Sequence, residues 1–168
     1  LQTYRPEWDV HVTAVTGGLT SINVAGPKCR EVLLRLVEGV DLSPEAFPYF
    51  HVRRGTVAGV ADCIIWRIGF TGELSYELHV PSGHALHVWE SLLTSGEDLG
   101  IRTFGVEAQR ILRLEKGHYI VGQDTDGLTK APTAGLGGLV KLDKPDTIGL
   151  PELKAAYART DLPILVAI

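Results

Sequence analysis

The residues best suited to bind a polar ligand lie between Trp66 and Leu78, where two apolar segments flank a glycine-containing turn. This pattern is typical of a β-hairpin or a tight corner. Glu73 places a carboxylate at the tip, and Arg67 and Glu77 lie close by on the flanking segments. A tip carried on a rigid β frame can hold a polar ligand group in fixed geometry. The alternative is an ordinary solvated turn, because turns are commonly polar.

Two arginines form a second candidate site. Arg110 and Arg113 stand three positions apart on a helix predicted from about Val106 to Glu115, which Gly117 ends. The planar guanidinium group matches a carboxylate, a group found on the tail of many metabolites. A solvated helix face explains these charges equally well.

Other reactive residues favour structural explanations. His84 and His87 have a spacing that could bind a metal, but no third ligand lies at a suitable distance, so two exposed histidines on an amphipathic helix are favoured. Cys29 lies in the first turn of a predicted helix, where the dipole could lower a thiol pKa. Its place on the apolar stripe favours a buried structural cysteine instead. Without a third ligand we expect no metal site, and because no glycine-rich phosphate motif occurs we expect no dinucleotide site.

Composition narrows the possible partners. The 168 residues are 45% hydrophobic and 21% charged, which is typical of a globular domain with its own core. The net charge of -4 and the scattered basic residues argue against nucleic-acid binding. No apolar run approaches the roughly 18 residues of a membrane span. Cys29 and Cys63 form no disulfide or metal pattern, so a cytoplasmic setting is expected.

The periodicity predicts an α+β domain with an antiparallel sheet packed against helices. A hairpin turn at Gly17-Gly18 joins the first two strands. The expected strands are Asp9–Val15, Thr20–Ala25, Phe50–Arg53, Thr56–Val60, Cys63–Ile68 and Leu74–Val80. The expected helices run from Gly26-Pro27 to Gly39, from Ser82 through Ala85, Val88, Trp89 and Leu92, and from Val106 to Glu115.

The composition changes after Gly117, where glycines and polar residues indicate a long loop of the kind that is often functional. A short helix is predicted over Pro151–Ala158 and a strand over Leu162–Ile168. We expect a domain at residues 1–150 and a connector with the first strand of a second domain at 151–168. An unpaired apolar strand of this kind favours self-association. The chain has no methionine and begins within ordered-looking sequence, so we expect a piece truncated at both ends.

Four motifs follow one another along the chain, at Arg67–Leu78, Leu112–Gly117, Gly122–Thr129 and Pro132–Leu136. In this order they resemble the folate-binding aminomethyltransferase family, also called the glycine cleavage T-protein family. The resemblance is greatest to the C-terminal region of the alpha subunits of heterotetrameric sarcosine oxidases. The segments that indicate this subgroup are Trp8–Val12, Gly39–Ser43 and Glu115–Gly127.

The resemblance implies the folate-binding domain of the aminomethyltransferase fold and a tetrahydrofolate site. Glu73 would bind the pterin, whose adjacent N–H donors suit a carboxylate. Arg113 matches a position near the folate glutamate tail, but many relatives have A-R-D where this chain has Ala108-Gln-Arg110, so the choice between Arg110 and Arg113 stays open. Phe70 and Tyr119 would stack on the rings. Thr71 and Arg67 complete the expected set.

The resemblance also implies a reaction for the longer parent protein. It would oxidatively demethylate sarcosine, a small amine, and capture the one-carbon unit as 5,10-methylenetetrahydrofolate. Flavin and NAD would bind other parts of the complex, and other sarcosine oxidase subunits would be partners. The expected catalytic acid lies upstream of Leu1, so the fragment itself is predicted to be inactive. Alternatives are a glycine-cleavage aminomethyltransferase, a dimethylglycine-oxidising relative, and a non-catalytic folate-binding or subunit-contact module.

Overall fold

The structure is a computed structural model that describes residues 8–145 and 147–166. The chain divides into two compact units, Leu1–Gly105 and Val106–Ile168. The domain boundary predicted at residue 150 does not coincide with the border between these units, and it stays a prediction. No helix in the described ranges is both long and apolar enough to cross a membrane.

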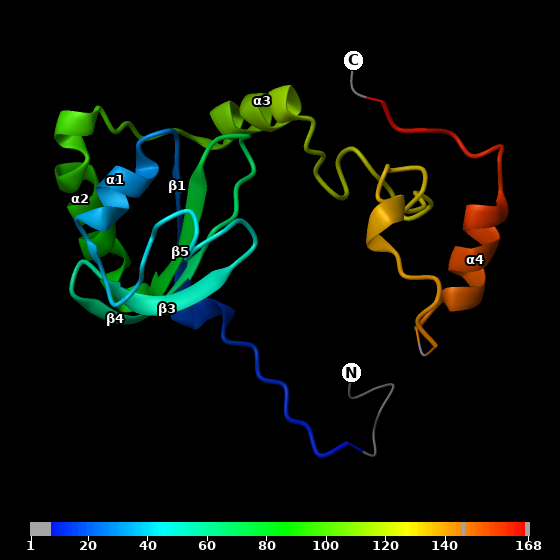
Figure 1. Ribbon diagram of the computed structural model, residues 1–168, viewed down its shortest axis with the longest axis horizontal. Helices are drawn as coiled ribbons and strands as arrows, with labels where there is room; N and C mark the ends of the chain where they lie inside the picture. Colours follow the sequence, from blue (N-terminus) through cyan, green and yellow to red (C-terminus); the bar gives the residue numbers. More distant parts are fainter. Residues whose placement is uncertain (1–7, 146, 167–168) are drawn as a thin grey trace. The chain divides into compact units, whose positions relative to one another are not determined.

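The first unit is built on an antiparallel sheet, as the sequence predicted. Within residues 8–105, five strands pair in the order β1-β5-β4-β3-β2 (Figure 1). Their bounds are β1 Leu19–Ala25, β2 Val37–Glu38, β3 Val52–Val57, β4 Val60–Trp66 and β5 Ser75–Pro81. The predicted α+β class is confirmed.

Alternation along β5 decides which face of the sheet is buried. Tyr76, Leu78 and Val80 are fully buried, whereas Glu77 and His79 point to the opposite face and are partly exposed. Side chains in a strand alternate between the two faces, so this pattern fixes the orientation of the strand. Strand β1 is buried on the same face of the sheet, because its buried residues lie opposite the buried residues of β5.

Two helices cover that apolar face (Figure 1). Helix α1, Cys29–Leu34, and helix α2, Ala85–Ser95, contact each other and β5. Val88 and Leu92 of α2 are buried as predicted, but Trp89 is 38% exposed. Trp89 lies about 100° around the helix from Val88, which places it at the margin of the buried stripe. Helix α1 also ends earlier than the predicted Gly39, because Val37 and Glu38 pair with β3.

The strand predicted over Asp9–Val15 is wrong. Residues 9–15 are exposed and lie in no strand, and Thr16–Gly18 forms a short 3-10 turn (η1) before β1. Alternation is compatible with a strand but does not supply a partner, and in the described residues β1 pairs with β5 instead. Residues 1–7 lie outside the described residues.

The two strands predicted over 50–53 and 56–60 are one strand, β3. Gly55 lies within β3, at a point where the backbone comes so close to Val40 that only glycine fits. A Cβ at this position would lie 2.6 Å from Val40 Cγ2. The turn lies at Ala58-Gly59, where both residues have positive φ, and β4 begins immediately afterwards. A two-residue turn with positive φ at both positions suits the twist of a hairpin.

The second unit contains helix α3, Val106–Lys116, and helix α4, Leu150–Ala158, with a 3-10 turn (η4) at Gly137–Leu139. Both helices match the predictions, and the residues after Gly117 form the predicted long loop. The final predicted strand is not formed in its described part, residues 162–166, although Leu165 N donates to the Thr133 carbonyl at 2.9 Å. Residues 167 and 168 lie outside the described ranges.

The burial of α2 gives a direct test of the fold. Leu92 is 2% exposed and packs in the core, whereas Leu86 on the same helix is 68% exposed. Leu92→Ala should lower the free energy of unfolding by about 2–5 kcal/mol, the range for emptying a buried leucine site. Leu86→Ala should change it by no more than about 0.5 kcal/mol. Chemical denaturation of both variants measures this difference, and equal effects would contradict the orientation of α2.

Candidate functional site

The predicted corner lies between β4 and β5. These strands pair with Trp66 opposite Glu77 and Ile64 opposite His79, so the residues from Arg67 to Leu74 form the connection. Thr71 is 8% exposed and Glu73 is exposed at the tip. Phe70 is half-buried in the same connection. The structure therefore brings four predicted site residues together in one loop: Arg67, Phe70, Thr71 and Glu73.

Backbone interactions hold the corner in one conformation. The Leu74 carbonyl accepts hydrogen bonds from Gly26 N at 2.8 Å and from the Cys29 thiol at 3.2 Å. Gly69 permits a close approach, because a Cβ there would lie 2.9 Å from the Ser75 Cβ. Gly72 has φ +91°, a value that favours glycine. The tip is therefore mounted on a rigid frame rather than on a free loop.

Cys29 belongs to this frame and is not a nucleophile. Its side chain is 4% exposed, and burial raises the pKa of the thiol to about 11, against the opposing influence of Arg67 and Arg30. A thiol with such a pKa stays protonated near neutral pH and donates its hydrogen to Leu74. The structural interpretation of Cys29 is confirmed.

Arg67 stabilises the corner through a hydrogen bond and through the contacts of its charged group with two aromatic rings. Its Nη1 donates to the Ser75 carbonyl at 2.9 Å, and its guanidinium carbon lies 5.2 Å from the centre of the Tyr76 ring and 5.6 Å from that of Tyr49. These are cation–π distances. Arg67 thus connects the end of β4 with the start of β5.

Glu77 is a second carboxylate near the corner, on the sheet face that α1 and α2 do not cover. Its Oε1 accepts a hydrogen bond from Ser21 Oγ at 2.7 Å and lies 3.2 Å from His79 Nε2. The His79 and Trp66 rings are tilted against each other, with centres 5.8 Å apart. From the sequence, Glu77 was predicted only to lie close to Glu73. The alternation of apolar and polar residues along β5 already indicates that Glu77 lies on the sheet face opposite to the buried one.

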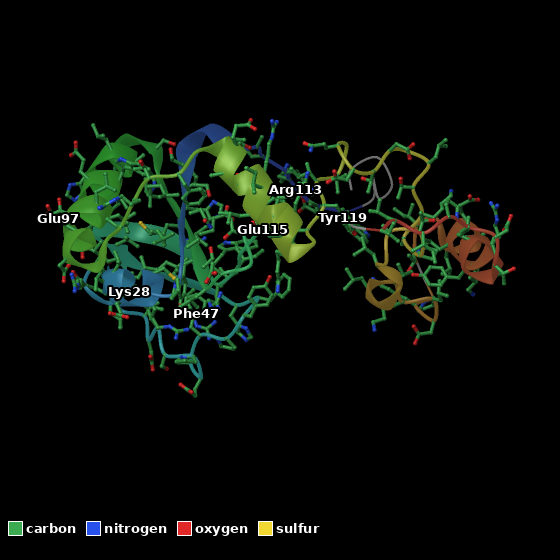
Figure 2. The ribbon with its side chains drawn as sticks, turned by 90° about the horizontal axis from the view of Figure 1, so that it is seen from above. Lys28, Phe47, Glu97, Arg113, Glu115 and Tyr119 are labelled. Carbon is green, nitrogen blue, oxygen red and sulfur yellow. The ribbon has the colours of Figure 1, made fainter. Side chains whose placement is uncertain are left out.

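Arg113 in the second unit is almost fully buried, with 2% exposure (Figure 2). Its Nη1 donates to Asp124 Oδ2 and, at 3.1 Å, to the His118 carbonyl, and its Nη2 lies 3.4 Å from Asp124 Oδ1. Asp124 Oδ2 also accepts from Ile120 N at 2.6 Å. The hydrogen bond from Arg113, followed by the one from Ile120, lowers the pKa of Asp124. This ion pair fixes the loop that follows α3.

The two candidate arginines have different environments. The Arg110 side chain is 50% exposed and lies 2.8 Å from the Glu107 carboxylate, an exposed pair within one helical turn. Arg113 instead directs its guanidinium to the chain's own carboxylate. Tyr119, just beyond α3 (Figure 2), is half-buried, and its hydroxyl has no hydrogen-bond partner among the described residues. The other predicted site residues, Arg110, Arg113 and Tyr119, therefore form a second set in this unit.

Asp126 stabilises the turn in the second half of the motif Gly122–Thr129, which also contains Asp124. Its Oδ1 accepts hydrogen bonds from Leu128 N, Thr129 N and Thr129 Oγ1, each at 2.9 Å. The Thr129 hydroxyl is the largest influence that lowers the pKa of Asp126. Aspartate in such turns replaces a backbone acceptor. The two aspartates of this motif thus shape the loop.

The histidine pair lies away from the corner residues. His87 Nε2 lies 2.9 Å from the Ala58 carbonyl, and both His84 and His87 line a hollow of about 450 Å³ beside the Ala58-Gly59 turn. Both side chains are exposed. Among the described residues, no three histidine, cysteine, aspartate or glutamate side chains gather in a way that could hold a metal ion.

Comparison with known families matches residues 1–144 to the family described as "GCVT N-terminal domain". The chain therefore belongs to this family, and the resemblance to the glycine cleavage T-protein family is confirmed. The crystal structure of glycine cleavage system aminomethyltransferase T from Bartonella henselae has a similar fold. Its TM-score is 0.65 at 26% identity, over 79% of this chain and 34% of that one.

Similar proteins include two named enzymes. Sarcosine oxidase subunit alpha of Corynebacterium sp. (strain P-1) is 41% identical over 96% of this chain and 16% of its own length. Aminomethyltransferase of Halothermothrix orenii is 40% identical over 74% of this chain and 34% of its own length. The chain thus spans about a sixth of the first relative and a third of the second.

The ion pair between the buried Arg113 and the partly exposed Asp124 makes stability depend on pH. The pKa of Asp124 is lowered from its ordinary value of 3.8, so the pair stabilises the fold above that pH, and the contribution is lost as the pH falls through the lower, folded-state value. Asp124→Asn should reduce the unfolding midpoint at pH 7, and its difference from the wild type should shrink below about pH 3.8.

The exposed Glu107–Arg110 pair supplies the control. Glu107→Gln should cause little change at any pH, because exposed ion pairs contribute about 0–1 kcal/mol. Thermal unfolding followed by circular dichroism across this pH range tests both variants. An Asp124→Asn variant as stable as the wild type at pH 7 would contradict the role of the pair.

Proposed function

We propose that this chain binds a reduced folate and takes part in one-carbon transfer. The observation that carries the proposal is the rigid corner between β4 and β5, which presents the exposed Glu73 carboxylate in a chain of the T-protein family. A relative named aminomethyltransferase and a similar solved aminomethyltransferase support this chemistry.

Glu73 is the proposed acceptor for the pterin ring. A carboxylate offers two oxygens to the adjacent N–H donors of the pterin edge, and charge-assisted hydrogen bonds of this kind are strong. Thr71 and Phe70 share the same connection, so the hydroxyl and the aromatic ring can contribute a polar contact and a stacking contact. Arg67 supports their geometry through its bond to the Ser75 carbonyl.

Arg110 and Arg113 are assigned different parts in folate binding. Arg110 is exposed and has donors available to a carboxylate of the folate tail, since its pairing with Glu107 is solvated. Arg113 is engaged by Asp124, which favours a supporting part in which it fixes the loop that carries Tyr119. Tyr119 is then a stacking candidate held by that loop.

The whole protein is proposed to act as the sarcosine oxidase relatives' name indicates, with sarcosine or another small amine as substrate and tetrahydrofolate as the one-carbon acceptor. Flavin and NAD would bind elsewhere in that protein or in its other subunits, and the setting would be cytoplasmic. The alternatives are a glycine-cleavage aminomethyltransferase, which the second relative favours, and a dimethylglycine-oxidising relative. A non-catalytic folate-binding or subunit-contact module is the alternative of another class.

The pterin assignment is tested by removing the charge at the tip. Glu73→Gln should weaken binding of 5-formyltetrahydrofolate by about 10- to 150-fold, the equivalent of ~1.5–3 kcal/mol for a hydrogen bond to a charged group. The fold should be retained because the side chain is exposed. Isothermal titration calorimetry gives the affinity, and circular dichroism checks the fold.

Glu77→Gln is the matched comparison, since it removes a carboxylate from β5 next to the corner. If the loss of affinity follows Glu77 and not Glu73, the pterin is bound on the open sheet face and the assignment to the tip is wrong. If the wild-type chain does not bind the reduced folate at all, the proposal that this chain has a folate site fails.

A further inference from the structure

The dipeptide Asp126-Gly127 is a chemically reactive sequence outside the residues assigned to folate binding. It is the one Asp-Gly pair in the 168 residues, and the sequence has no Asn-Gly pair. The side chain of an aspartate can react with the backbone nitrogen of the next residue. Glycine hinders this reaction least because it has no Cβ. Both residues are exposed, so solvent reaches the reacting atoms.

Gly127 supplies a backbone amide that is not engaged elsewhere. Among the described residues its N–H donates to no acceptor. A Cβ placed on Gly127 would meet no atom within 4 Å, and its φ lies outside the positive range that favours glycine. The conformation of the loop therefore does not require glycine at this position. What glycine contributes is a nitrogen that no side chain of its own shields.

Hydrogen bonds hold the Asp126 carboxylate in a fixed position. Its Oδ1 accepts from Leu128 N, Thr129 N and Thr129 Oγ1, each at 2.9 Å, and Thr129 Oγ1 itself accepts from Asp126 N at 3.0 Å. These bonds restrain the side-chain torsions, so the carboxyl carbon does not turn freely toward Gly127 N.

The same bonds also make the carboxyl group less reactive. The Thr129 hydroxyl, followed by Leu128 N, lowers the pKa of Asp126 and so favours the ionised form. An ionised carboxylate is a poor electrophile, because its oxygen leaves readily only after protonation. Thr129 therefore restrains both the geometry and the reactivity of Asp126.

We propose that Asp126-Gly127 is a site of isoaspartate formation and that the Thr129 hydroxyl slows the conversion. Gly127 N attacks Asp126 Cγ, and a C–N bond forms while a carboxyl oxygen leaves as water with the amide proton and the acid proton. Water then opens the resulting cyclic imide at either carbonyl, which gives aspartate or isoaspartate. The reaction needs water alone and no oxidant or cofactor. It is independent of folate binding.

Conversion to isoaspartate removes the acceptor that organises this turn. The former side-chain carbon Cγ becomes part of the backbone, so its oxygen is no longer the carboxylate that Leu128 N and Thr129 N bind. The product carries a new carboxylate, the group that isoaspartyl methyltransferases esterify with the methyl group of S-adenosylmethionine. The altered chain is thus a substrate for this class of repair enzyme, at the exposed motif Gly122–Thr129.

Site-resolved measurement of isoaspartate tests the proposal. The complete 168-residue chain is incubated near neutral pH and digested, and electron-transfer fragmentation distinguishes isoaspartate from aspartate at each position. Isoaspartate should be most abundant at Asp126, and it should form faster in the urea-unfolded chain, where the hydrogen bonds are absent. Thr129→Val removes the hydroxyl and keeps the size of the side chain, so the folded variant should convert about 2- to 13-fold faster, the effect of one ordinary hydrogen bond. Thr129→Ser keeps the hydroxyl and should convert at the wild-type rate.

Gly127→Ala is the matched control, because the structure accommodates a Cβ at this position. Its methyl group shields the nitrogen, so it should suppress conversion alone and combined with Thr129→Val. Circular dichroism checks the fold of each variant.

The site assignment is overturned if the unfolded wild-type chain forms no more isoaspartate at Asp126 than at Asp62 or Asp98, or if Gly127→Ala does not slow the conversion. The role of Thr129 is overturned if folded Thr129→Val converts at the wild-type rate, or if Thr129→Ser converts as fast as Thr129→Val. If Thr129→Val does not fold, the wild type decides: equal rates in its folded and unfolded states overturn the protection.

Discussion

The pairing of β4 with β5 through the Arg67–Leu74 connection is the constraint on which the first unit depends. Strand β5 lies between β1 and β4 and contacts both helices, so its register sets the core. A shift by one residue would turn Glu77 and His79 toward the helices and expose Tyr76, Leu78 and Val80. The same register places Glu73 at the tip, so the core and the candidate site depend on one interaction.

Local patterns in the sequence were sufficient for the elements whose burial repeats over several residues. The alternation along β5 and the apolar stripe of α2 predict their structures because burial of one face decides each conformation. Residues 9–15 also alternate, yet they form no strand, because a strand needs a partner as well as a pattern. Likewise, separate strands were predicted on either side of Gly55, where the structure has a close backbone approach within a single strand, β3. Neither the partner nor the approach is encoded in the local pattern.

The candidate site shows the same limit. Glu73, Thr71 and Phe70 could be placed in one connection from the sequence because the connection itself is short and flanked by clear strands. The burial of Arg113 could not be foreseen, since a charged residue on a helix is ordinarily exposed. Its environment depends on Asp124, which is brought back to the helix by a loop whose course the sequence pattern does not specify. Apolar neighbours on α3, Ile111 and Leu114, are instead 60% and 57% exposed.

The carboxylates of this chain differ in how much of their hydrogen-bonding capacity is already used. Asp124 and Asp126 accept several bonds from their own loops, and Glu77 accepts one from Ser21 beside His79. A carboxylate whose oxygens are occupied in this way stabilises the chain but has fewer acceptor sites for a ligand. Glu73 is exposed, and within the described parts of the chain no hydrogen bond or ion pair reaches its carboxylate. Since the backbone beneath it is fixed by Gly26, Cys29 and Arg67, this acceptor is rigidly placed and uncommitted, which is the combination that recognition of two adjacent N–H donors requires.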